Sequence, residues 1–284
     1  MVENSRILVI GATGHVGGQV AAQLIAHPVT VRALARDPRT AALPTGVEVV
    51  PGDLTAPDTL HYALDGVDTV FLTWPMLSEE IADAVIAQIA EQARRIVLLS
   101  SAAVDDAVAV QTNPIGAVHA AIERPILESG LEWTFLRPHG FATNTIEWAP
   151  QIRAGDLVRG AYGAATVALL HEADIAAVAV RALTTDGHAG ARYELTSSAA
   201  LPRTEQVAAI GAALGRTLTW VEIDLEQAIA EMTWLPPETA RVVLTGLAGY
   251  VDTPCTTTTT IQEVTGGPAR SYHQWAVDHV ADFS

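Results

Sequence analysis

The chain of 284 residues contains no lysine, because all 16 of its basic residues are arginines. This absence excludes a Schiff-base mechanism and any step that needs a lysine ammonium group. The arginines are scattered along a chain whose formal net charge is −16, and they form no basic stripe that would neutralise a row of phosphates. We therefore expect no nucleic-acid partner.

Cysteine is nearly absent as well. Cys255 is the single cysteine, which excludes an intrachain disulfide, a CxxC pair and a thiolate metal cluster. We expect it to be a small, buried or half-buried residue. The histidines show no HxxxH or HExxH spacing, and we predict no metal site.

Apolar runs long enough to span a membrane are also missing. The first residues lead into the apolar run 7–10 without the basic region and cleavage site of a secretory signal. We expect a cytoplasmic protein with no membrane partner. Charged residues make up only 17% of the chain and hydrophobic residues 49%, which favours a compact α/β protein over a disordered one.

The first half of the sequence shows a regular alternation. Short apolar runs rich in β-branched residues alternate with longer alanine-rich segments of helical period, as in βαβ units with a parallel sheet. The predicted strands are 6–10, 30–34, 47–51, 69–73, 95–100 and 134–137. The helices predicted between them are 15–25, 78–93 and a segment that ends near Ser129.

The alternation stops after Pro138. Residues 140–163 are rich in glycine and predict an irregular crossing into a second lobe. Helices predicted largely for that lobe are 173–183, 203–214, 225–232 and 237–247, and the threonine run 256–260 predicts a strand or an extended loop. We predict an α/β fold, with a Rossmann-type doubly wound parallel sheet in residues 1–140. A small, mainly helical C-terminal substrate lobe occupies 141–284, with some segments returning to the sheet.

A glycine-rich loop follows the first predicted strand and opens the first helix. Glycines are needed in such a loop because the turn is tight, the backbone approaches a pyrophosphate closely, and the helix packs hard on the sheet. The helix N-terminus offers free N–H groups to the phosphates. The predicted cofactor contacts here are Gly11, Thr13, Gly14, His15, Val16 and Gly17.

The end of the second predicted strand indicates which dinucleotide binds. An acidic residue there would bind the ribose diol of NAD, but Arg36 stands in its place, and a guanidinium suits the 2′-phosphate of NADP. Asp37 precedes Pro38 and is expected to start a turn or cap a short helix. We predict NADP as the cofactor, with NAD as the alternative.

Further cofactor contacts are predicted at the ends of the other strands. Asp53 and Leu54 follow the third strand and are placed to contact the adenine ring; alternatively, Asp53 caps its own loop. Thr73 and Ser100 end the fourth and fifth strands and Pro138 follows the sixth, and the carboxyl ends of parallel strands meet at the ligand-binding edge of the sheet.

These motifs resemble the NmrA-like group of atypical short-chain dehydrogenase/reductases. The similar segments are 11–17, 31–38, 52–54, 99–101, 119–123, 129–131, 134–138, 171–176 and 265–283, so the likeness covers nearly the whole chain. The resemblance implies an NAD(P)-binding Rossmann fold. It implies less about activity, because the group is similar both to reductases of quinones and cationic dyes and to regulators that bind the dinucleotide without turning it over.

The sequence departs from the catalytic pattern of the wider superfamily, a serine or threonine together with Tyr-x3-Lys-x3-Glu. With Glu123 aligned on the glutamate, His119 falls on the lysine, Ile115 on the tyrosine and Ala102 on the serine. The tyrosine of the pattern transfers the proton, and the lysine lowers its pKa and holds the ribose. A normal Tyr–Lys dyad is excluded, whatever the alignment, since the chain has no lysine.

His119 is the candidate replacement for that lysine. It is placed to donate to the nicotinamide ribose, with Glu123 one helical turn on holding its tautomer. The alternative is a half-buried histidine paired to Glu123 with no catalytic part. Pro125 lies in the same predicted helix, where it would remove a backbone hydrogen bond and kink or break the helix.

The acceptor is expected beyond the carboxyl ends of the strands, against a largely apolar and aromatic wall. The residues predicted to form its pocket are Trp74, Ser101, Phe141, Asn144 and Trp148, with His139 as a second candidate catalytic residue that hydrogen-bonds an oxygen. Each of these is equally compatible with ordinary loop packing.

The function predicted from these features is an NADPH-dependent reductase of a small conjugated acceptor: a quinone, an enone or a cationic aromatic. The alternatives are a non-catalytic NAD(P)-binding sensor that regulates a protein partner, and a redox-neutral isomerase, dehydratase or cyclase with His139 or His119 as the base. We expect a monomer or a homodimer.

Overall fold

The computed structural model describes residues 5–75 and 78–284. The chain divides into two compact units. Unit 1 takes in the described residues up to Pro138 together with Glu172–Leu195 and Glu263–Gly266, and unit 2 consists of His139–His171, Thr196–Gln262 and Gly267–Ser284. No helix among the described residues is long and apolar enough to cross a membrane.

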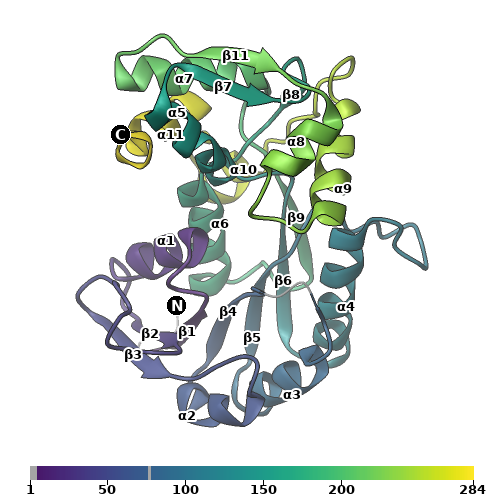
Figure 1. The fold of residues 1–284 in the computed structure, drawn as a ribbon. Coiled ribbons are helices and arrows are strands. Elements are labelled where there is room, and N and C mark those ends of the chain that lie inside the picture. The colour runs from purple at the N-terminus through teal and green to yellow at the C-terminus, as the bar shows by residue number, and fades with distance from the viewer. Residues whose placement is uncertain (1–4, 76–77) are drawn as a thin grey trace. The chain divides into compact units, whose positions relative to one another are not determined.

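Unit 1 is built on a sheet of seven parallel strands, and the predicted fold class is confirmed (Figure 1). The strands are β1 (Arg6–Ile10), β2 (Thr30–Ala35), β3 (Val47–Pro51), β4 (Thr69–Thr73), β5 (Arg95–Leu99), β6 (Glu132–Pro138) and β9 (Ala191–Leu195). They pair in the order β3-β2-β1-β4-β5-β6-β9. The chain order reverses between β1 and β4, which is where open α/β sheets bind their ligands.

Side chains on both faces of the central strands are buried. A continuous apolar run in the sequence predicts this for a parallel strand. Leu8 and Ile10 of β1 belong to the core formed with the helices of one face. Ile7 and Val9, which point the other way, are also fully or almost fully excluded from solvent.

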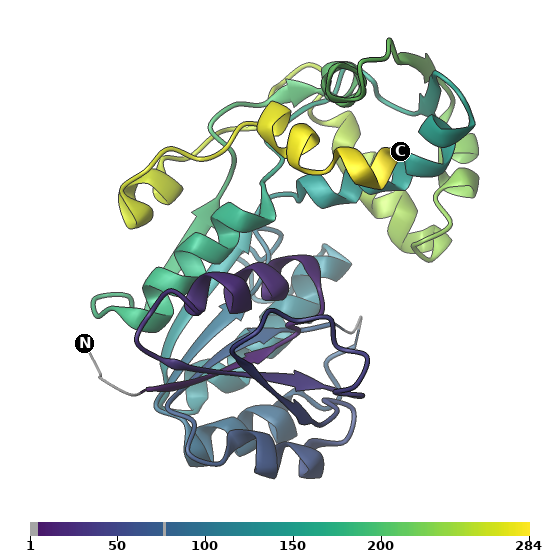
Figure 2. The same ribbon diagram turned by 90° about the vertical axis from the view of Figure 1, so that its left-hand side faces the viewer.

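Helices cover the two faces of the sheet (Figures 1 and 2). One face carries α1 (His15–Leu24) and α6 (Glu172–Thr184), which pack against each other. The other carries η1 (Pro57–Thr59), α2 (Leu60–Leu64), α3 (Ala82–Gln92) and α4 (Pro114–Glu128). The helix predicted at 173–183 corresponds to α6, which lies in unit 1 rather than in the lobe for which the group of C-terminal helices was largely predicted.

Helix α4 continues through Pro125, so the predicted break does not occur. Pro125 and the neighbouring Ile122 and Ile126 are buried against the sheet. We attribute the continuity to this packing, which offsets the missing backbone hydrogen bond. The helix begins at Pro114, after an Asn113 cap whose side chain accepts from two backbone N–H groups.

Unit 2 is mainly helical, with two small strand pairs. In these pairs, β7 (Leu157–Gly160) is parallel to β11 (Thr219–Glu222), and β8 (Thr166–Val167) is antiparallel to β10 (Leu201–Pro202). Its helices are η2 (Ala142–Trp148), α5 (Ala149–Ala154), α7 (Arg203–Leu214), α8 (Leu225–Glu231), α9 (Pro237–Ala248), α11 (Tyr272–Asp278) and η3 (Val280–Phe283). Residues 256–259 form no strand, and α10 (Thr260–Thr265) begins directly after them.

Candidate functional site

The turn between β1 and α1 has the geometry of a phosphate loop. Gly11 has a φ of +89°, which glycine adopts without strain, and its carbonyl oxygen accepts a hydrogen bond of 3.0 Å from the Gly14 N–H. A Cβ atom at Gly17 would lie 2.2 Å from the same carbonyl oxygen. Gly11 and Gly17 are therefore glycines because the helix packs directly on the turn.

The outer rim of this loop is open. Thr13, Gly14 and His15 are exposed, whereas Val16 and Gly17 are buried. Gly14 caps α1 without a side-chain hydrogen bond, so the first N–H groups of the helix remain available to a ligand. A Cβ at Gly14 would touch only the Gly11 carbonyl oxygen, at 3.4 Å. The free N–H groups and the open side of Gly14 fit a pyrophosphate.

Thr73 ends β4, the strand next to β1, and lies beside this turn. Its Oγ1 is buried and has no hydrogen-bond partner among the described residues. A Cβ at Gly11 would lie 2.8 Å from the Cβ of Thr73, so the two residues are in close contact. The unpaired hydroxyl is a polar group adjacent to the loop that a bound dinucleotide could satisfy.

The arginine predicted to select the cofactor lies exposed at the end of β2, and its charge contributes to lowering the pKa of Asp53. Arg36 follows β2, is exposed, and makes no hydrogen bond or ion pair with any residue that the structure describes. Asp37 is occupied by Arg39, whose Nε and Nη2 each lie 3.0 Å from a carboxylate oxygen and whose backbone N–H donates to Oδ1. Asp37 therefore forms a turn, as one of its predicted roles requires. Arg39 is a second cation at this strand end that the sequence analysis missed.

Asp53 and Leu54, in the loop that follows β3, make contacts within the protein itself. Asp53 accepts a hydrogen bond of 2.9 Å from the Thr55 N–H, which lowers the pKa of its carboxyl group. This is the loop-capping alternative for Asp53. Leu54 is 6% exposed and belongs to the core of unit 1.

A buried ion network fastens α4 to β6. Arg137 donates from Nε and Nη2 to the two carboxylate oxygens of Glu123, at 3.0 and 2.6 Å, and from Nη1 and Nη2 to Asp106, at 2.7 and 2.9 Å. Ser100 donates to Glu123 at 2.6 Å. The side chains of Arg137 and Glu123 are each only 4% exposed.

This network changes the role predicted for Glu123. It does not hydrogen-bond His119; instead, Nδ1 of His119 lies 2.9 Å from the Ile115 carbonyl oxygen, one turn earlier in α4. Since a carbonyl oxygen only accepts, Nδ1 carries the proton and Nε2 is an acceptor in the neutral ring. Burial lowers the pKa of His119 from its ordinary value of 6.5, while the hydrogen bond with Ile115 and the charge of Glu123 oppose this shift.

The predicted acceptor-pocket residues of unit 1 have local partners. Trp74 is 7% exposed, packs in the core and donates from Nε1 to the Ser78 carbonyl oxygen at 2.9 Å. Ser101 is half-buried and accepts from the Ala103 N–H at 3.1 Å. Pro138, which was predicted as a cofactor contact, is buried, and its carbonyl oxygen accepts from the Ala102 N–H.

The remaining predicted residues lie in unit 2. Asn144 and His139 are exposed and Phe141 is half-buried. Nδ1 of His139 lies 4.0 Å from Sγ of Cys255, and this contact lowers the pKa of the thiol. Cys255 is buried, as the sequence predicts.

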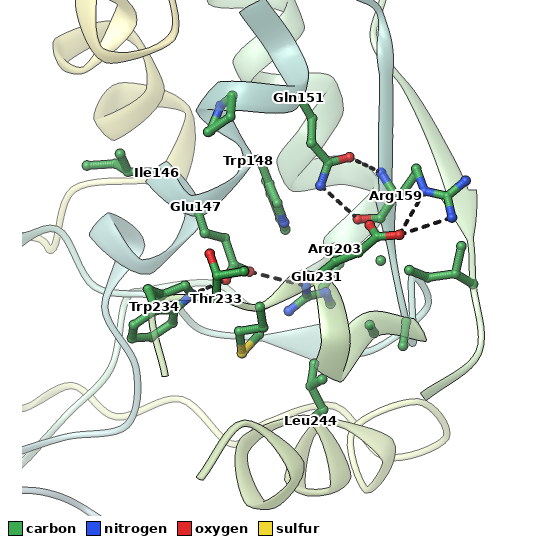
Figure 3. Close-up of a pocket in the computed structure, with 16 residues that line it drawn as sticks. Ile146, Glu147, Trp148, Gln151, Arg159, Arg203, Glu231, Thr233, Trp234 and Leu244 are labelled. Atoms are coloured by element: carbon green, nitrogen blue, oxygen red, sulfur yellow. Dashed lines mark hydrogen bonds and ion pairs between the residues drawn. The ribbon is translucent and has the colours of Figure 1, made fainter. Parts of the chain in front are cut away.

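Trp148 is almost fully buried and lines a cavity of about 620 Å³ within unit 2 (Figure 3). The other labelled residues that line it are Ile146, Glu147, Gln151, Arg159, Arg203, Glu231, Thr233, Trp234 and Leu244. None of these residues was predicted from the sequence. One available signal was Arg203, a cation at the start of a predicted helix, where the helix dipole disfavours positive charge.

Relatives of known activity match this chain over nearly its full length. A (4-alkanoyl-5-oxo-2,5-dihydrofuran-3-yl)methyl phosphate reductase from Streptomyces griseus is 39% identical over 282 residues, which cover 98% of this chain and 99% of that protein. A NAD(P)H azoreductase from Xenophilus azovorans is 34% identical over 292 residues, with the same coverage of 98% and 99%.

Solved structures show the same fold. An NADPH-dependent quinone oxidoreductase from Escherichia coli has a TM-score of 0.77 at 24% identity, covering 96% of this chain and 98% of that one. The negative transcriptional regulator NmrA, solved in complex with NAD, has a TM-score of 0.73 at 17% identity, covering 98% and 96%. The model of an NAD(P)H-binding family matches residues 11–186. The chain belongs to this NAD(P)H-binding family, and it shares its fold with NmrA.

Proposed function

We propose that this protein is an NADPH-dependent reductase of a small conjugated acceptor, such as an enone, a quinone or a cationic aromatic compound. The observation that carries the proposal is an open phosphate loop at the N-terminus of α1 in a chain that has no lysine. The loop retains a dinucleotide, while the missing lysine removes the proton-transfer dyad that a simple ketone requires.

Selection of NADPH is assigned to Arg36. Its exposed guanidinium makes no hydrogen bond or ion pair within the described chain and is free to bind the 2′-phosphate. An aspartate that could bind the ribose diol of NAD is present in Asp37, but its carboxylate is held by Arg39. Arg39, whose side chain is 89% exposed, adds positive charge at the same strand end.

The class of acceptor follows from the proton requirement. Hydride addition to a simple ketone creates a basic alkoxide, which needs a proton donor at once. The α4 positions that align with the superfamily dyad hold Ile115 and His119, neither of which supplies a phenol. Reduced nicotinamide supplies the hydride, and an acceptor that delocalises or neutralises the added charge can be reduced without the dyad.

The two histidines have different proposed roles. Nε2 of His119 is an acceptor, so the imidazole would receive a hydrogen bond from a ribose hydroxyl rather than donate one. His119 would thus position the cofactor. His139 is exposed and is proposed to hydrogen-bond an oxygen of the acceptor, with Phe141 and Asn144 from the following segment completing the acceptor pocket.

The two relatives support a conjugated acceptor. A 5-oxo-2,5-dihydrofuran ring has its carbon–carbon double bond in conjugation with the carbonyl group, and an azo dye has an N=N bond conjugated with its rings. In both compounds the reducible bond is part of a delocalised system. We therefore place an unsaturated lactone or enone first among the acceptors to be tested.

Purified protein mixed with NADPH and a panel of unsaturated lactones, quinones and azo dyes tests the proposal. We expect the absorbance of NADPH to fall with at least one of these acceptors, and cyclohexanone to serve as the inactive control. Tight binding of NADPH without oxidation by any acceptor would contradict the proposal and favour a non-catalytic dinucleotide-binding protein.

A further inference from the structure

Arg203 is a buried cation with almost no partners. It is the first residue of α7 and only 8% exposed, yet its guanidinium makes no hydrogen bond with any described residue. Its Nε is buried without a partner. The nearest carboxylate belongs to Glu147, whose Oε1 lies 3.8 Å from Nη2 of Arg203, beyond hydrogen-bond distance.

This placement is unfavourable for the folded protein. A buried guanidinium with unsatisfied N–H groups loses its hydration, and a cation in the first turn of a helix is repelled by the helix dipole. The rings of Trp148 and Trp220 have centroids 5.2 and 5.3 Å from the Arg203 Cζ and stabilise its positive charge. They do not accept conventional hydrogen bonds from the guanidinium N–H groups. The donors of Arg203 are therefore available to a ligand.

Arg203 lines the cavity of unit 2, and Figure 3 shows its guanidinium together with Glu147 inside it. The other charged lining residues compensate each other, since Nε and Nη2 of Arg159 lie 3.2 and 3.1 Å from the Glu231 carboxylate. Trp234 donates to Glu147 at 2.6 Å, and burial raises the pKa of that carboxyl group, against the opposing effects of Trp234 and Arg203. Protonation of Glu147 would leave Arg203 as the net charge of the cavity.

Most of the remaining wall is apolar, although the polar side chains of Gln151 and Thr233 also line it. Its apolar part includes Ile146, Trp148, Ile223, Met232 and Leu244. A cavity of about 620 Å³ has the volume of a site for a small organic molecule. A ligand that fits it combines a hydrocarbon part with one anionic group.

We propose that this cavity binds an amphiphilic organic anion, whose phosphate or carboxylate is held by the guanidinium of Arg203 and whose hydrocarbon part lies against the apolar wall. The planar fork of arginine binds two oxygens of such a group at once. The anion comes either from the acceptor itself, if the acceptor carries a phosphate or carboxylate, or from a separate effector. Only the first source rests on the proposed reductase function.

The test is calorimetric titration of hexyl phosphate into the whole protein saturated with NADP⁺, which keeps the phosphate loop of unit 1 occupied. Hexanol and inorganic phosphate, titrated separately, each lack one half of the ligand. We expect hexyl phosphate to bind at least about tenfold more tightly than either. Equal affinity for hexanol and hexyl phosphate would overturn the proposal.

Two variants with opposite expected effects on hexyl phosphate affinity test the role of Arg203. Arg203→Met should weaken hexyl phosphate binding at least about tenfold while leaving hexanol binding unchanged. Glu147→Gln should strengthen it, because Arg203 loses its acidic neighbour. The matched control is Arg216→Gln, which removes a half-buried arginine paired with Asp156 in the same unit. Equal weakening by Arg203→Met and Glu147→Gln would contradict the assignment, as would unchanged binding in Arg203→Met.

Inhibition kinetics identify the source of the anion once an acceptor is known. Competition between hexyl phosphate and the acceptor indicates that the acceptor's own anionic group occupies the cavity. Inhibition or activation without competition indicates a separate effector. Both outcomes support an anion site, and because the titrations require no turnover, the site and the reductase function can fail independently.

Discussion

Gly17 packs so closely on Gly11 that a Cβ atom at Gly17 would lie 2.2 Å from the Gly11 carbonyl oxygen, a distance at which the backbone itself must move. At Gly14 the same construction meets that oxygen at 3.4 Å, an ordinary contact. The two glycines therefore have different functions: Gly17 allows the helix to pack on the turn, and Gly14 leaves room for a ligand.

Gly14→Val and Gly17→Val form a matched pair that separates these functions. Gly14→Val should abolish NADPH binding while changing the free energy of unfolding by less than about 1 kcal/mol, because the added carbons point to the open side of the loop. Gly17→Val should destabilise the fold by about 2 kcal/mol or more, since it clashes with backbone. Urea unfolding and NADPH titration measure the two effects. Unchanged NADPH affinity in Gly14→Val would mean that the phosphate loop is placed wrongly.

Arg36→Gln should weaken NADPH binding by about 1.5–3 kcal/mol through the loss of a charge-assisted contact, and should leave NADH binding almost unchanged. Arg39→Gln is the control, because it removes the same single positive charge at the same strand end. It should weaken NADPH binding less, because Arg39 is already paired with Asp37. Equal losses for NADPH and NADH in Arg36→Gln would show that Arg36 does not contact the 2′-phosphate.

The cofactor affinity should depend on pH through His119. Its pKa is lowered by burial, so the neutral ring with Nε2 as acceptor is the form present above its ordinary pKa of 6.5. When the pH falls through the lowered pKa, which lies below 6.5, protonation turns Nε2 into a donor, and the KM for NADPH should rise. His119→Ala should raise the KM at neutral pH and remove the dependence on acidity. A KM profile identical in both proteins would exclude a role for His119 in binding.

The same depressed pKa affects stability. Because His119 is harder to protonate in the folded state, protonation at acidic pH favours the unfolded chain. The contribution of His119 to the free energy of unfolding is therefore fully present above the unfolded-state pKa and is lost as the pH falls through the lowered folded-state pKa. This sign gives the cofactor measurement its necessary control: thermal unfolding of the same samples must show that the protein is still folded where the KM rises.

Glu123→Gln should destabilise unit 1 far more than Asp106→Asn. Glu123 is buried with Arg137, and its removal leaves a guanidinium partly unpaired in the interior, at a cost of about 3–5 kcal/mol. The side chain of Asp106 is 56% exposed, so its loss should cost about 1 kcal/mol or less. Urea unfolding compares the two variants. Similar midpoints would show that the buried ion pair does not hold α4 on the sheet.

No single tyrosine should be essential for hydride transfer. Phenylalanine at each of the five tyrosine positions should cost less than about tenfold in turnover, or roughly 1.4 kcal/mol of barrier. The tyrosines are Tyr62, Tyr162, Tyr193, Tyr250 and Tyr272. Two are held by neighbours: the hydroxyl of Tyr272 lies 2.7 Å from Thr145 Oγ1, and that of Tyr193 lies 2.8 Å from Nδ1 of His188. A folded, cofactor-binding variant without hydride transfer would contradict this prediction and identify the missing proton donor.

The parts of unit 1 that could be predicted from the sequence are those with strong local patterns. The apolar runs of β1, β2, β4 and β5 are buried on both faces, and the loop at Gly11 joins the first of them to a helix. Strand β9 (Ala191–Leu195) was missed because its side chains alternate in exposure along a polar edge strand. Its identity depends on pairing with β6, which is distant in the chain.

Three other features depend on contacts that no local pattern contains. Helix α6 is apolar nearly all round, so its sequence does not indicate which sheet it covers. Pro125 lies inside α4, although proline usually kinks or ends a helix, because its packing in the core offsets the lost hydrogen bond. Arg203 owes its burial to Trp148 and Trp220, which come from separate segments. The cofactor loop was accessible to sequence reasoning because its chemistry resides in one short stretch, whereas the cavity of unit 2 is assembled from many.

Each unit is assembled from three separate stretches of chain. A fragment ended near residue 140 would lack both β9 and α6, and the apolar side chains of Ile7, Val9 and Phe71 would lose part of the layer that shields them from water. Neither unit can therefore be transferred to another protein as one continuous segment of chain. A change of acceptor preference between relatives with this architecture must therefore arise by substitution of residues rather than by exchange of a whole unit. A chimera of two such proteins should be joined at several matched crossover points rather than at one.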